Sequence, residues 1–426
     1  MEEYKKRIAD QLLADQLDAM GAVLIEGAKY CGKTTLAARQ AGSVLYMADP
    51  QTRDENVAMA QLSISRLLEG ATPRLIDEWQ IVPELWDAVR AEVDKRNADG
   101  QFMLTGSAVP ADSSRIFHSG TGRFARLTLR TMSLWESGES NGSVSLAALF
   151  RNAQEIEGLN PLDLEELAYL ICRGGWPRAT LKTNRKAALI QARQYYKAVV
   201  EYDVSRADNV ERNPELVMRL MRSYARHQGS QATLSTLLAD LKGNEVSTLS
   251  EGTIYAYINA LKRIFVIEDA LAWTPNLRSK TAIRTADTRY FADPSIATAA
   301  LGLEPEDLPR DLNTFGLLFE TLCIRDLRVY LQAAGGTVYH YRDKNGLECD
   351  AVLHMPNGTY GLAEIKLGGA DAIEQGAATL LELEHKIDSD KMHAPAFRMV
   401  VTGVGKYAYR RPQDGTLVVP IACLKD

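Results

Sequence analysis

The sequence predicts an α/β protein of several domains, and three observations lead to this fold class. The chain has 426 residues, whereas a single domain usually has about 50 to 250. Short apolar runs alternate with helical patterns over residues 1–135, which is typical of a parallel sheet covered by helices. Helical patterns dominate residues 136–300, and helices and strands mix again over residues 301–426. We therefore expect two α/β domains joined by a helical connector, divided at these positions.

The composition is that of a globular protein without a membrane segment. Hydrophobic residues make up 46% of the chain, charged residues 24%, and the formal net charge is -6. This mildly acidic total does not favour a chain that coats nucleic acid along its whole length. Residues 1–20 lack the apolar core of a signal peptide, and no apolar run reaches the roughly 20 residues that span a bilayer. We expect a cytoplasmic protein with no membrane partner.

The elements of the first domain follow from its hydrophobic pattern. Residues 1–20 predict an amphipathic helix, and residues 82–93 predict another helix. A glycine-rich loop after the first apolar run leads into a strongly helix-forming segment. The strands of the sheet are expected at residues 22–27, 43–48, 75–76, 102–104 and 124–129.

The connector carries helical patterns and a candidate nucleic-acid-binding motif. Residues 231–273 have the layout of a winged helix-turn-helix, with a second helix beginning near Ser250 and a strand-like run at 264–267. That second helix has only Lys262 and Arg263 as bases, and a helix that reads DNA is usually richer in Arg, Lys, Asn and Gln. Protein binding or internal packing therefore stays an alternative. Helices are expected at residues 163–172, 185–203, 214–227, 234–241 and 250–261.

The C-terminal domain is expected to alternate helices and strands. A long helical pattern covers residues 312–334, and a second one covers residues 370–385. A Pro-Asn-Gly turn at residues 356–358 separates two of the apolar runs. Strands are expected at residues 337–341, 349–354, 361–366, 398–402 and 416–420.

Residues 27–34 match the phosphate-binding loop, or P loop, with the pattern G-x-x-x-x-G-K-[ST] in full. The loop lies between an apolar strand and a helix, where its backbone N–H groups and the helix N-terminus face the phosphates. Lys33 would reach the β- and γ-phosphates, and the Thr34 hydroxyl would bind Mg²⁺. The expected nucleotide contacts are Gly27, Ala28, Lys29, Tyr30, Cys31, Gly32, Lys33, Thr34 and Thr35.

Acidic and hydroxyl groups follow two later strands. Asp77 and Glu78 end the third apolar run, where Asp77 would hold the magnesium ion and Glu78 would orient and deprotonate the attacking water. Thr105, Gly106 and Ser107 follow the fourth strand, and a hydroxyl there, with Ser107 as the candidate, could contact the γ-phosphate or the water. A plain strand-ending turn is the alternative.

An arginine after the fourth strand is a candidate finger that completes an active site. Arg123 and Arg126 follow the glycine-containing stretch 118–122. An arginine in such a place can stabilise the charge of the transferring phosphoryl group, either in its own chain or in a neighbour. Arg123 is the preferred candidate, and an ordinary surface role is the alternative for both.

The order of these motifs resembles a family of predicted prokaryotic AAA-type ATPases. The match continues in Arg-Gly-Gly-Trp-Pro at 173–177, Tyr-Phe-Ala-Asp at 290–293, Gly-Leu-Leu-Phe-Glu at 316–320 and Glu-Ile-Lys at 364–366. Trp79 stands where that family usually has a smaller aliphatic residue. The resemblance implies ATP as the nucleotide, a P-loop AAA-like sheet, a connector with a winged-helix element, and a C-terminal domain of poorly known function with a restriction-endonuclease-like fold.

Four C-terminal residues fit the order of a metal-dependent nuclease site. Glu320 lies on an expected helix, Asp350 on a strand, and Glu364 and Lys366 on one face of the next strand because side chains alternate along a strand. Asp350 and Glu364 would bind Mg²⁺, which prefers oxygen ligands, and Glu320 would orient the metal site from the helix. Lys366 would help to activate water. Ordinary surface charges, or a nuclease-like fold that does not cut, are the alternatives.

The sequence leaves three candidate functions. The leading one is an ATPase whose nucleotide state positions the C-terminal nuclease-like domain, with DNA, a protein partner or self-association as candidate partners. The second is a nucleotide-gated protein-binding module with slow turnover. The third is a Mg²⁺-dependent DNA nuclease that ATP regulates.

Overall fold

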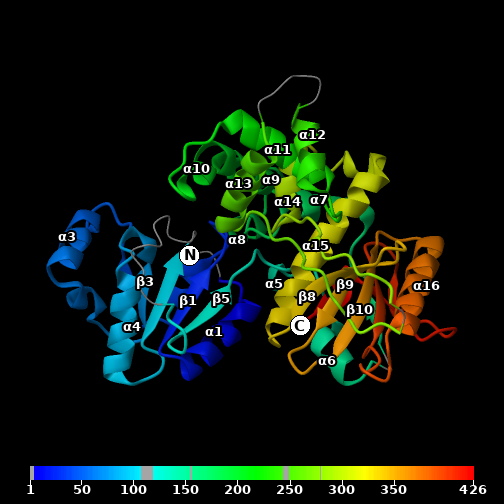
Figure 1. Ribbon diagram of the computed structural model, residues 1–426, viewed down its shortest axis with the longest axis horizontal. Coiled ribbons are helices and arrows are strands. Elements are labelled where there is room, and N and C mark those ends of the chain that lie inside the picture. Colours follow the sequence, from blue (N-terminus) through cyan, green and yellow to red (C-terminus); the bar gives the residue numbers. More distant parts are fainter. Residues whose placement is uncertain (1–3, 107–118, 154–155, 243–248, 279) are drawn as a thin grey trace.

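A parallel five-stranded sheet forms the centre of the first domain (Figure 1). The computed structural model describes residues 4–106, 119–153, 156–242, 249–278 and 280–426. In it the strands follow the order β2-β3-β4-β1-β5, and every neighbouring pair is parallel. All five predicted strands are present: β1 (Ala22–Glu26), β2 (Ser43–Tyr46), β3 (Arg74–Asp77), β4 (Phe102–Gly106) and β5 (Phe124–Thr128).

The strand register brings the predicted motifs to one edge of this sheet. Glu26, the last residue of β1, pairs with Gly106 at the end of β4, and Asp77 at the end of β3 pairs with Thr105. The P loop follows β1 directly, and β4 separates β1 from β3. The loop, the end of β4 and the Asp77–Glu78 pair therefore meet at the carboxyl edge.

Helices cover both faces of the sheet, because alternate residues of the central strands are buried on each side. Val23 and Ile25 pack under the helices α1 (Ile8–Ala19) and α2 (Lys33–Ala38). Ala22 and Leu24 face the opposite layer. That layer consists of α3 (Arg53–Ser63), η1 (Ile64–Leu68), η2 (Trp79–Ile81) and α4 (Leu85–Arg96).

The connector is helical, as predicted, and several of its helices begin at a side chain that caps the first turn. The caps are Asp163, Asn184, Asn213, Ser250 and Asp293, whose side chains accept backbone N–H groups. The elements are α7 (Leu164–Arg173), α8 (Pro177–Thr180), α9 (Arg185–Ala198), the π-helical turn η4 (Val199–Asp203), α10 (Val204–Arg206), α11 (Pro214–Arg226), α12 (Leu234–Lys242), α13 (Glu251–Arg263) and α14 (Pro294–Leu301).

The segment expected to be a winged helix contains both of its helices, α12 and α13. The expected strand at 264–267 is reduced to isolated antiparallel bridges, which join Ile267 to Phe291 and Ala270 to Thr288. Residues 243–248, between the two helices, lie outside the described residues. The winged-helix layout therefore stays a prediction.

The C-terminal domain is built on a mixed seven-stranded sheet in the order β7-β12-β13-β11-β10-β9-β8. The helices α15 (Leu312–Gln332) and α16 (Ala370–Lys386) pack on opposite faces of it. Every strand that the sequence predicts here is present. The strands are β7 (Gly158–Leu159), β8 (Thr337–Arg342), β9 (Glu348–His354), β10 (Tyr360–Lys366), β11 (Arg398–Thr402), β12 (Tyr407–Arg410) and β13 (Leu417–Pro420).

The connector and the C-terminal domain share one hydrophobic core, which runs from Leu134 to Leu424 apart from Ala28 of the P loop. Two short strands from the expected connector pair with C-terminal strands: β7 with β12, and β6 (Val144–Ser145) with β14 (Leu424–Lys425). The helices α5 (Leu134–Ser137) and α6 (Leu146–Arg151) also pack into this core. This packing joins the two parts into one unit, and the division at residue 300 stays a prediction.

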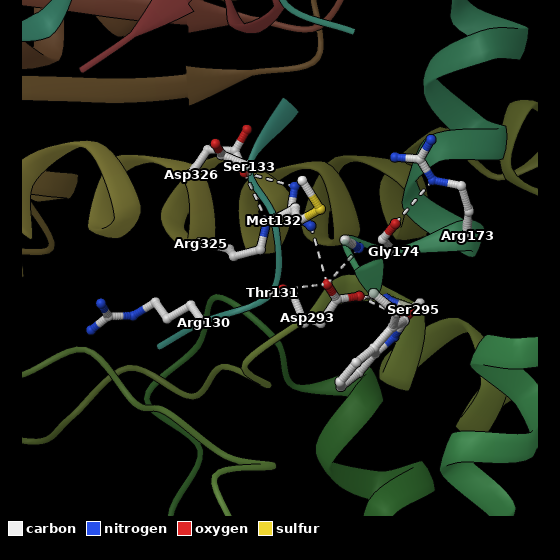
Figure 2. A network of polar contacts seen from close by, with 12 residues as sticks. Arg130, Thr131, Met132, Ser133, Arg173, Gly174, Asp293, Ser295, Arg325 and Asp326 are labelled. Atoms are coloured by element: carbon white, nitrogen blue, oxygen red, sulfur yellow. Dashed lines mark hydrogen bonds and ion pairs between the residues drawn. The ribbon is translucent and has the colours of Figure 1, made fainter. Parts of the chain in front are cut away.

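A buried polar network fastens this unit to the last segment of the first domain (Figure 2). Oδ2 of Asp293 accepts hydrogen bonds from the Thr131 hydroxyl at 2.7 Å, from the Gly175 N–H at 2.9 Å and from Arg325 at 3.1 Å. A Cβ atom on Gly174 would lie 2.3 Å from Asp293 Oδ1. The two glycines of the RGGWP segment are therefore required by the close approach of this carboxylate and of residues 131–133.

Candidate functional site

The P loop has a backbone conformation that its glycines allow. Gly27 and Gly32 have φ angles of 151° and 104°, which residues with side chains rarely adopt. A Cβ atom on Gly27 would lie 2.1 Å from the carbonyl oxygen of Leu129, so only glycine fits there. The loop leads directly into α2 at Lys33, and the first N–H groups of that helix have no intrahelical partner. These donors face the place where phosphates are expected.

Lys33 is buried, and its side chain folds back over the preceding residues of the P loop. Its ammonium group donates to the carbonyl oxygens of Gly27 at 2.9 Å and Ala28 at 2.8 Å. Those carbonyls belong to the first residues of the loop, so the positive charge is held at the end where the β- and γ-phosphates of a nucleotide would lie.

Asp77 accepts two hydroxyl hydrogen bonds at the carboxyl edge of the sheet. The Thr34 hydroxyl donates to Asp77 Oδ1 at 2.7 Å, and the Thr105 hydroxyl donates to the same oxygen at 2.5 Å. The loop, β3 and β4 thus contribute one oxygen-bearing group each. Hydroxyl and carboxylate oxygens are the ligands that Mg²⁺ prefers, so this donor set fits that ion.

Glu78 stands beside Asp77 in a left-handed backbone conformation, with φ 56° and ψ 45°. Non-glycine residues seldom adopt this conformation, and it is found more often at functional sites. Burial, followed by the charge of Asp77, raises the pKa of the Glu78 carboxyl above its usual value, although Lys33 and Lys29 oppose the rise. A carboxyl whose pKa moves toward neutrality is suited to act as a general base.

The side chain of Gln80 holds Glu78 in place. Its amide Nε2 donates a hydrogen bond to Glu78 Oε2, and this bond lowers the pKa of Glu78. A Cβ atom on Gly106 would lie 2.7 Å from the side-chain oxygen Oε1 of Gln80, so the glycine at the end of β4 leaves room for the Gln80 side chain. The sequence analysis did not assign a role to Gln80. Its position two residues after Glu78 was the available signal.

The remaining predicted residues of the first domain are placed differently. Ser107 lies outside the described residues. Arg123 precedes β5 and therefore lies at the amino edge of the sheet, opposite the P loop, where its Nε donates to Asp94 at 2.8 Å. Arg126 lies in the middle of β5 and donates to Glu26 at 3.3 Å. Arg123 thus does not reach the site of its own chain.

Two contacts attach the P loop to other parts of the chain, and the sequence analysis missed both. Arg7 donates to the carbonyl oxygen of Cys31 at 3.1 Å and to that of Arg130 at 2.9 Å, and it lies 3.0 Å from a carboxylate oxygen of Glu136. Lys29 forms an ion pair of 2.5 Å with Asp203, in η4. These partners are distant in the sequence, so no local pattern could have indicated them.

A cavity of about 280 Å³ opens beside the loop. Tyr30, whose side chain is exposed, forms one wall, and the rings of Trp176 and Tyr195, whose centroids lie 3.9 Å apart, form another. The connector therefore lies directly against the P loop. The complete lining is Tyr30, Trp176, Arg178, Gln191, Gln194, Tyr195 and Ala198.

The C-terminal site residues are also brought together. Lys366 lies 2.6 Å from Glu364 and 3.6 Å from Asp350, and the Ile365 N–H donates to Asp350 Oδ2 at 2.7 Å. Glu320 lies on α15, and its carboxylate accepts a hydrogen bond from the Tyr290 hydroxyl. Burial, followed by the Asp350 charge, raises the pKa of Glu320 well above its usual range.

Glu364 is also buried, and one of its carboxylate oxygens has no hydrogen-bond partner among the described residues. Burial, followed by the Asp350 charge, raises the pKa of Glu364 to about 8 against the opposing effect of Lys366. Among the residues that the structure describes, no group of three or more His, Cys, Asp or Glu side chains is arranged to hold a metal ion. Lys366 thus lies between Glu364 and Asp350, and a nuclease-like site at these residues stays a prediction.

Several basic side chains in and after the expected winged-helix segment form contacts within the chain. Lys262 at the end of α13 pairs with Asp269 at 2.8 Å, and Arg289 pairs with the same carboxylate at 2.9 Å. Arg278 donates to the Ser389 hydroxyl at 2.5 Å. Tyr255 is exposed on α13, whereas the ring of Tyr257 lies under Arg212. No helix within the described ranges has both the length and the apolar composition needed to cross a bilayer.

Comparison with known families supports the ATPase part of the chain. Residues 20–137 match a family model described as an AAA domain, which supports an AAA-type ATPase-like domain there. Residues 164–307 and 315–424 match two domains of unknown function, DUF8612 and DUF4143. A nuclease-like fold for the last domain is not part of these matches.

Individual relatives are distant. Uncharacterized proteins of Mycobacterium bovis and Mycobacterium tuberculosis are each 23% identical over 381 residues, which cover 88% of this chain and 77% of theirs. Among solved structures, a Walker-type ATPase of Pyrococcus abyssi is 15% identical, with a TM-score of 0.45 over 70% of this chain and 96% of that one. A Drosophila ORC structure bound to DNA is 13% identical, with a TM-score of 0.21 over 61% of this chain and 78% of that one. Both TM-scores are too low to support an argument.

Proposed function

We propose that the first domain binds ATP with Mg²⁺ and hydrolyses it. The observation that carries this proposal is the contact between the Thr34 hydroxyl and Asp77, 2.7 Å apart, at the sheet edge where the P loop and Glu78 meet. The match of residues 20–137 to an AAA domain supports it independently. Here the P loop N–H groups and Lys33 bind the phosphates, Thr34 and Asp77 hold the ion, and Glu78 takes the proton of the attacking water. A bound Mg²⁺ would neutralise charge on the phosphate oxygens.

The role of Asp77 can be tested through the magnesium requirement. Asp77→Asn keeps the size of the side chain but removes its charge, so ATP turnover should fall and need more Mg²⁺. Thr105→Ser, which keeps a hydroxyl beside Asp77, is the matched control. A turnover and a Mg²⁺ dependence in Asp77→Asn equal to those of the wild type would contradict the assigned role.

We further propose that the nucleotide state positions the unit formed by the connector and the C-terminal domain. Arg7 supports this coupling because it joins the Cys31 carbonyl in the P loop to the carbonyl of Arg130 and the carboxylate of Glu136. A rearrangement of the loop upon ATP binding would therefore act on residues that enter the second unit. DNA, a protein partner and self-association remain candidate partners of that unit.

This positioning can be measured as a distance. All five native cysteines are buried, so cysteines introduced for Leu62 on α3 and Tyr407 on β12, both exposed, would carry spin labels selectively. The distribution of distances between the labels should differ between ATP and ADP in a Glu78→Gln background, which is expected to retain ATP. Identical distributions would favour a nucleotide-gated module that acts without movement of the unit.

A magnesium-dependent nuclease is a second candidate function for the C-terminal domain. It is favoured by the contacts that join Lys366 to Glu364 and Asp350, and by the Glu364 oxygen that lacks a partner among the described residues. Cleavage of supercoiled DNA with Mg²⁺ should then be lost in Glu364→Gln and kept in Lys33→Ala without ATP. Absence of cleavage by the wild type under ATP, ADP and nucleotide-free conditions would reject this candidate.

A further inference from the structure

One cation of the P loop is bound by the connector instead of by the first domain. Lys29, the third residue of the loop, places its ammonium group 2.5 Å from Oδ1 of Asp203. The Asp203 side chain is 10% exposed, whereas that of Lys29 is 38% exposed. Within the described residues, no other basic side chain forms an ion pair with Asp203. A nearly buried carboxylate thus has a half-exposed loop lysine as its counterion.

The carboxylate is held by an irregular turn of the connector. Asp203 ends η4, where the α-helical pattern of α9 gives way to a π-helical one. Such π-helical turns are often found at functional sites. Burial, and then Asp203 and Cys31, raise the pKa of the Tyr195 hydroxyl, which is consistent with both groups lying near that ring. Asp203 is therefore built into the connector wall that faces the P loop.

Lys29 belongs to the same loop as Lys33, and its charge acts on the proposed base, Glu78. Lys33 donates to the carbonyl of Ala28, the residue that precedes Lys29, so the two lysines start from the same part of the loop. Lys29 and Lys33 both act electrostatically on Glu78, the proposed base. A phosphate held between Lys33 and Glu78 would thus bring negative charge close to Lys29.

We infer that Lys29 is a second cation for the terminal phosphate of ATP and that Asp203 is the positioning residue that competes for it. This inference rests on the proposed ATPase function. Binding of ATP transfers the Lys29 ammonium from Asp203 toward the γ-phosphate, and ADP leaves it on Asp203. The connector thereby senses whether the terminal phosphate is present.

The test compares ATP and ADP affinities, each with Mg²⁺, in the full-length chain. Lys29→Ala should lower the affinity for ATP about tenfold, the lower range for the loss of a hydrogen bond to a charged group, and should change the affinity for ADP less than twofold. Asp203→Asn should raise the affinity for ATP several-fold, because it removes the group that competes for Lys29. It should leave the affinity for ADP nearly unchanged. Lys29→Arg should retain much of the ATP preference.

The double variant separates this role from a merely structural ion pair. In a Lys29→Ala background, Asp203→Asn should no longer change ATP affinity, because no lysine is left to release. An ATP-to-ADP affinity ratio within twofold of the wild type in both single variants would overturn the inference. If Asp203→Asn fails to fold, the half-exposed Lys29 still allows Lys29→Ala and Lys29→Arg to decide. A wild type that binds neither nucleotide would instead reject the proposed function, and this inference with it.

Discussion

The Thr105 hydroxyl donates to Asp77 Oδ1 at 2.5 Å, and this oxygen also accepts the hydroxyl of Thr34. Thr105 is the second-to-last residue of β4, which lies between the P loop strand and the Asp77 strand, so it supports the carboxylate from the middle of the site. The proposed magnesium ligand is thereby fixed from two sides.

Thr105→Val removes this support with little change in shape. Loss of a hydrogen bond to a charged group costs about 1.5–3 kcal/mol, so ATP turnover at limiting Mg²⁺ should fall about tenfold or more. Titration of turnover against Mg²⁺ measures the effect. Thr105→Ser should stay close to the wild type, and a Thr105→Val titration that overlays the wild type would show that the bond has no part in ion binding.

Gln80→Leu tests whether Gln80 tunes the proposed base. The Gln80 amide lowers the pKa of Glu78, so its loss should raise that pKa further. Because the base must be deprotonated, the acid limb of turnover should move to higher pH while ATP affinity stays unchanged. Gln101→Leu, at the opposite edge of the sheet, is the control. An acid limb that does not move would assign Gln80 a packing role only.

Asp293→Ala should break the buried polar network of Figure 2 and lower the free energy of unfolding. It leaves the Arg325 guanidinium buried with one partner fewer, and breaking a buried ion pair costs about 3–5 kcal/mol. Urea unfolding measures the loss. Asp311→Ala, which removes an exposed helix cap, should cost only about 1 kcal/mol, and an equal cost for the two variants would contradict the network's importance.

Glu364 should make stability depend on pH. Its pKa in the folded protein is raised from 4.5 to about 8, so the folded state binds the proton more tightly than the unfolded state does. Stability is then lost as pH rises through this window, from about 4.5 to about 8. Glu364→Gln should narrow the fall in Tm between pH 5 and pH 8.5 by several degrees. The same change at the exposed Glu382 should leave the fall in Tm as it is in the wild type. A fall in Tm in Glu364→Gln equal to that of the wild type would show that Glu364 does not cause the pH dependence.

Much of the fold could be predicted because its elements have local signals. The runs that became β1, β3 and β4 are apolar and end at Gly27, Asp77 and Gly106. The helices α7, α9 and α13 begin at Asp, Asn or Ser caps. The shared core of the connector and the C-terminal domain had no such signal. Strands β6 and β7 are two residues each and depend on partners more than 240 residues away, β14 and β12.

The functional site also combines residues that have a local sequence signal with residues that have none. Gly27, Lys33, Thr34 and Asp77 carry chemistry at fixed spacings, and the structure brings these residues together. The Arg123 prediction rested on a glycine-containing stretch alone, and strand direction places that residue at the far edge. Asp203 and Arg7 reach the loop only through tertiary packing.

The most direct test of the account is phosphate release from ATP with Mg²⁺ by the wild type, Lys33→Ala and Glu78→Gln. The account predicts steady release by the wild type, loss of both ATP binding and release in Lys33→Ala, and retained binding in Glu78→Gln with release lowered by about 10²–10⁴, the range for a general base. A wild type that binds ATP but releases no more phosphate than Lys33→Ala would contradict it.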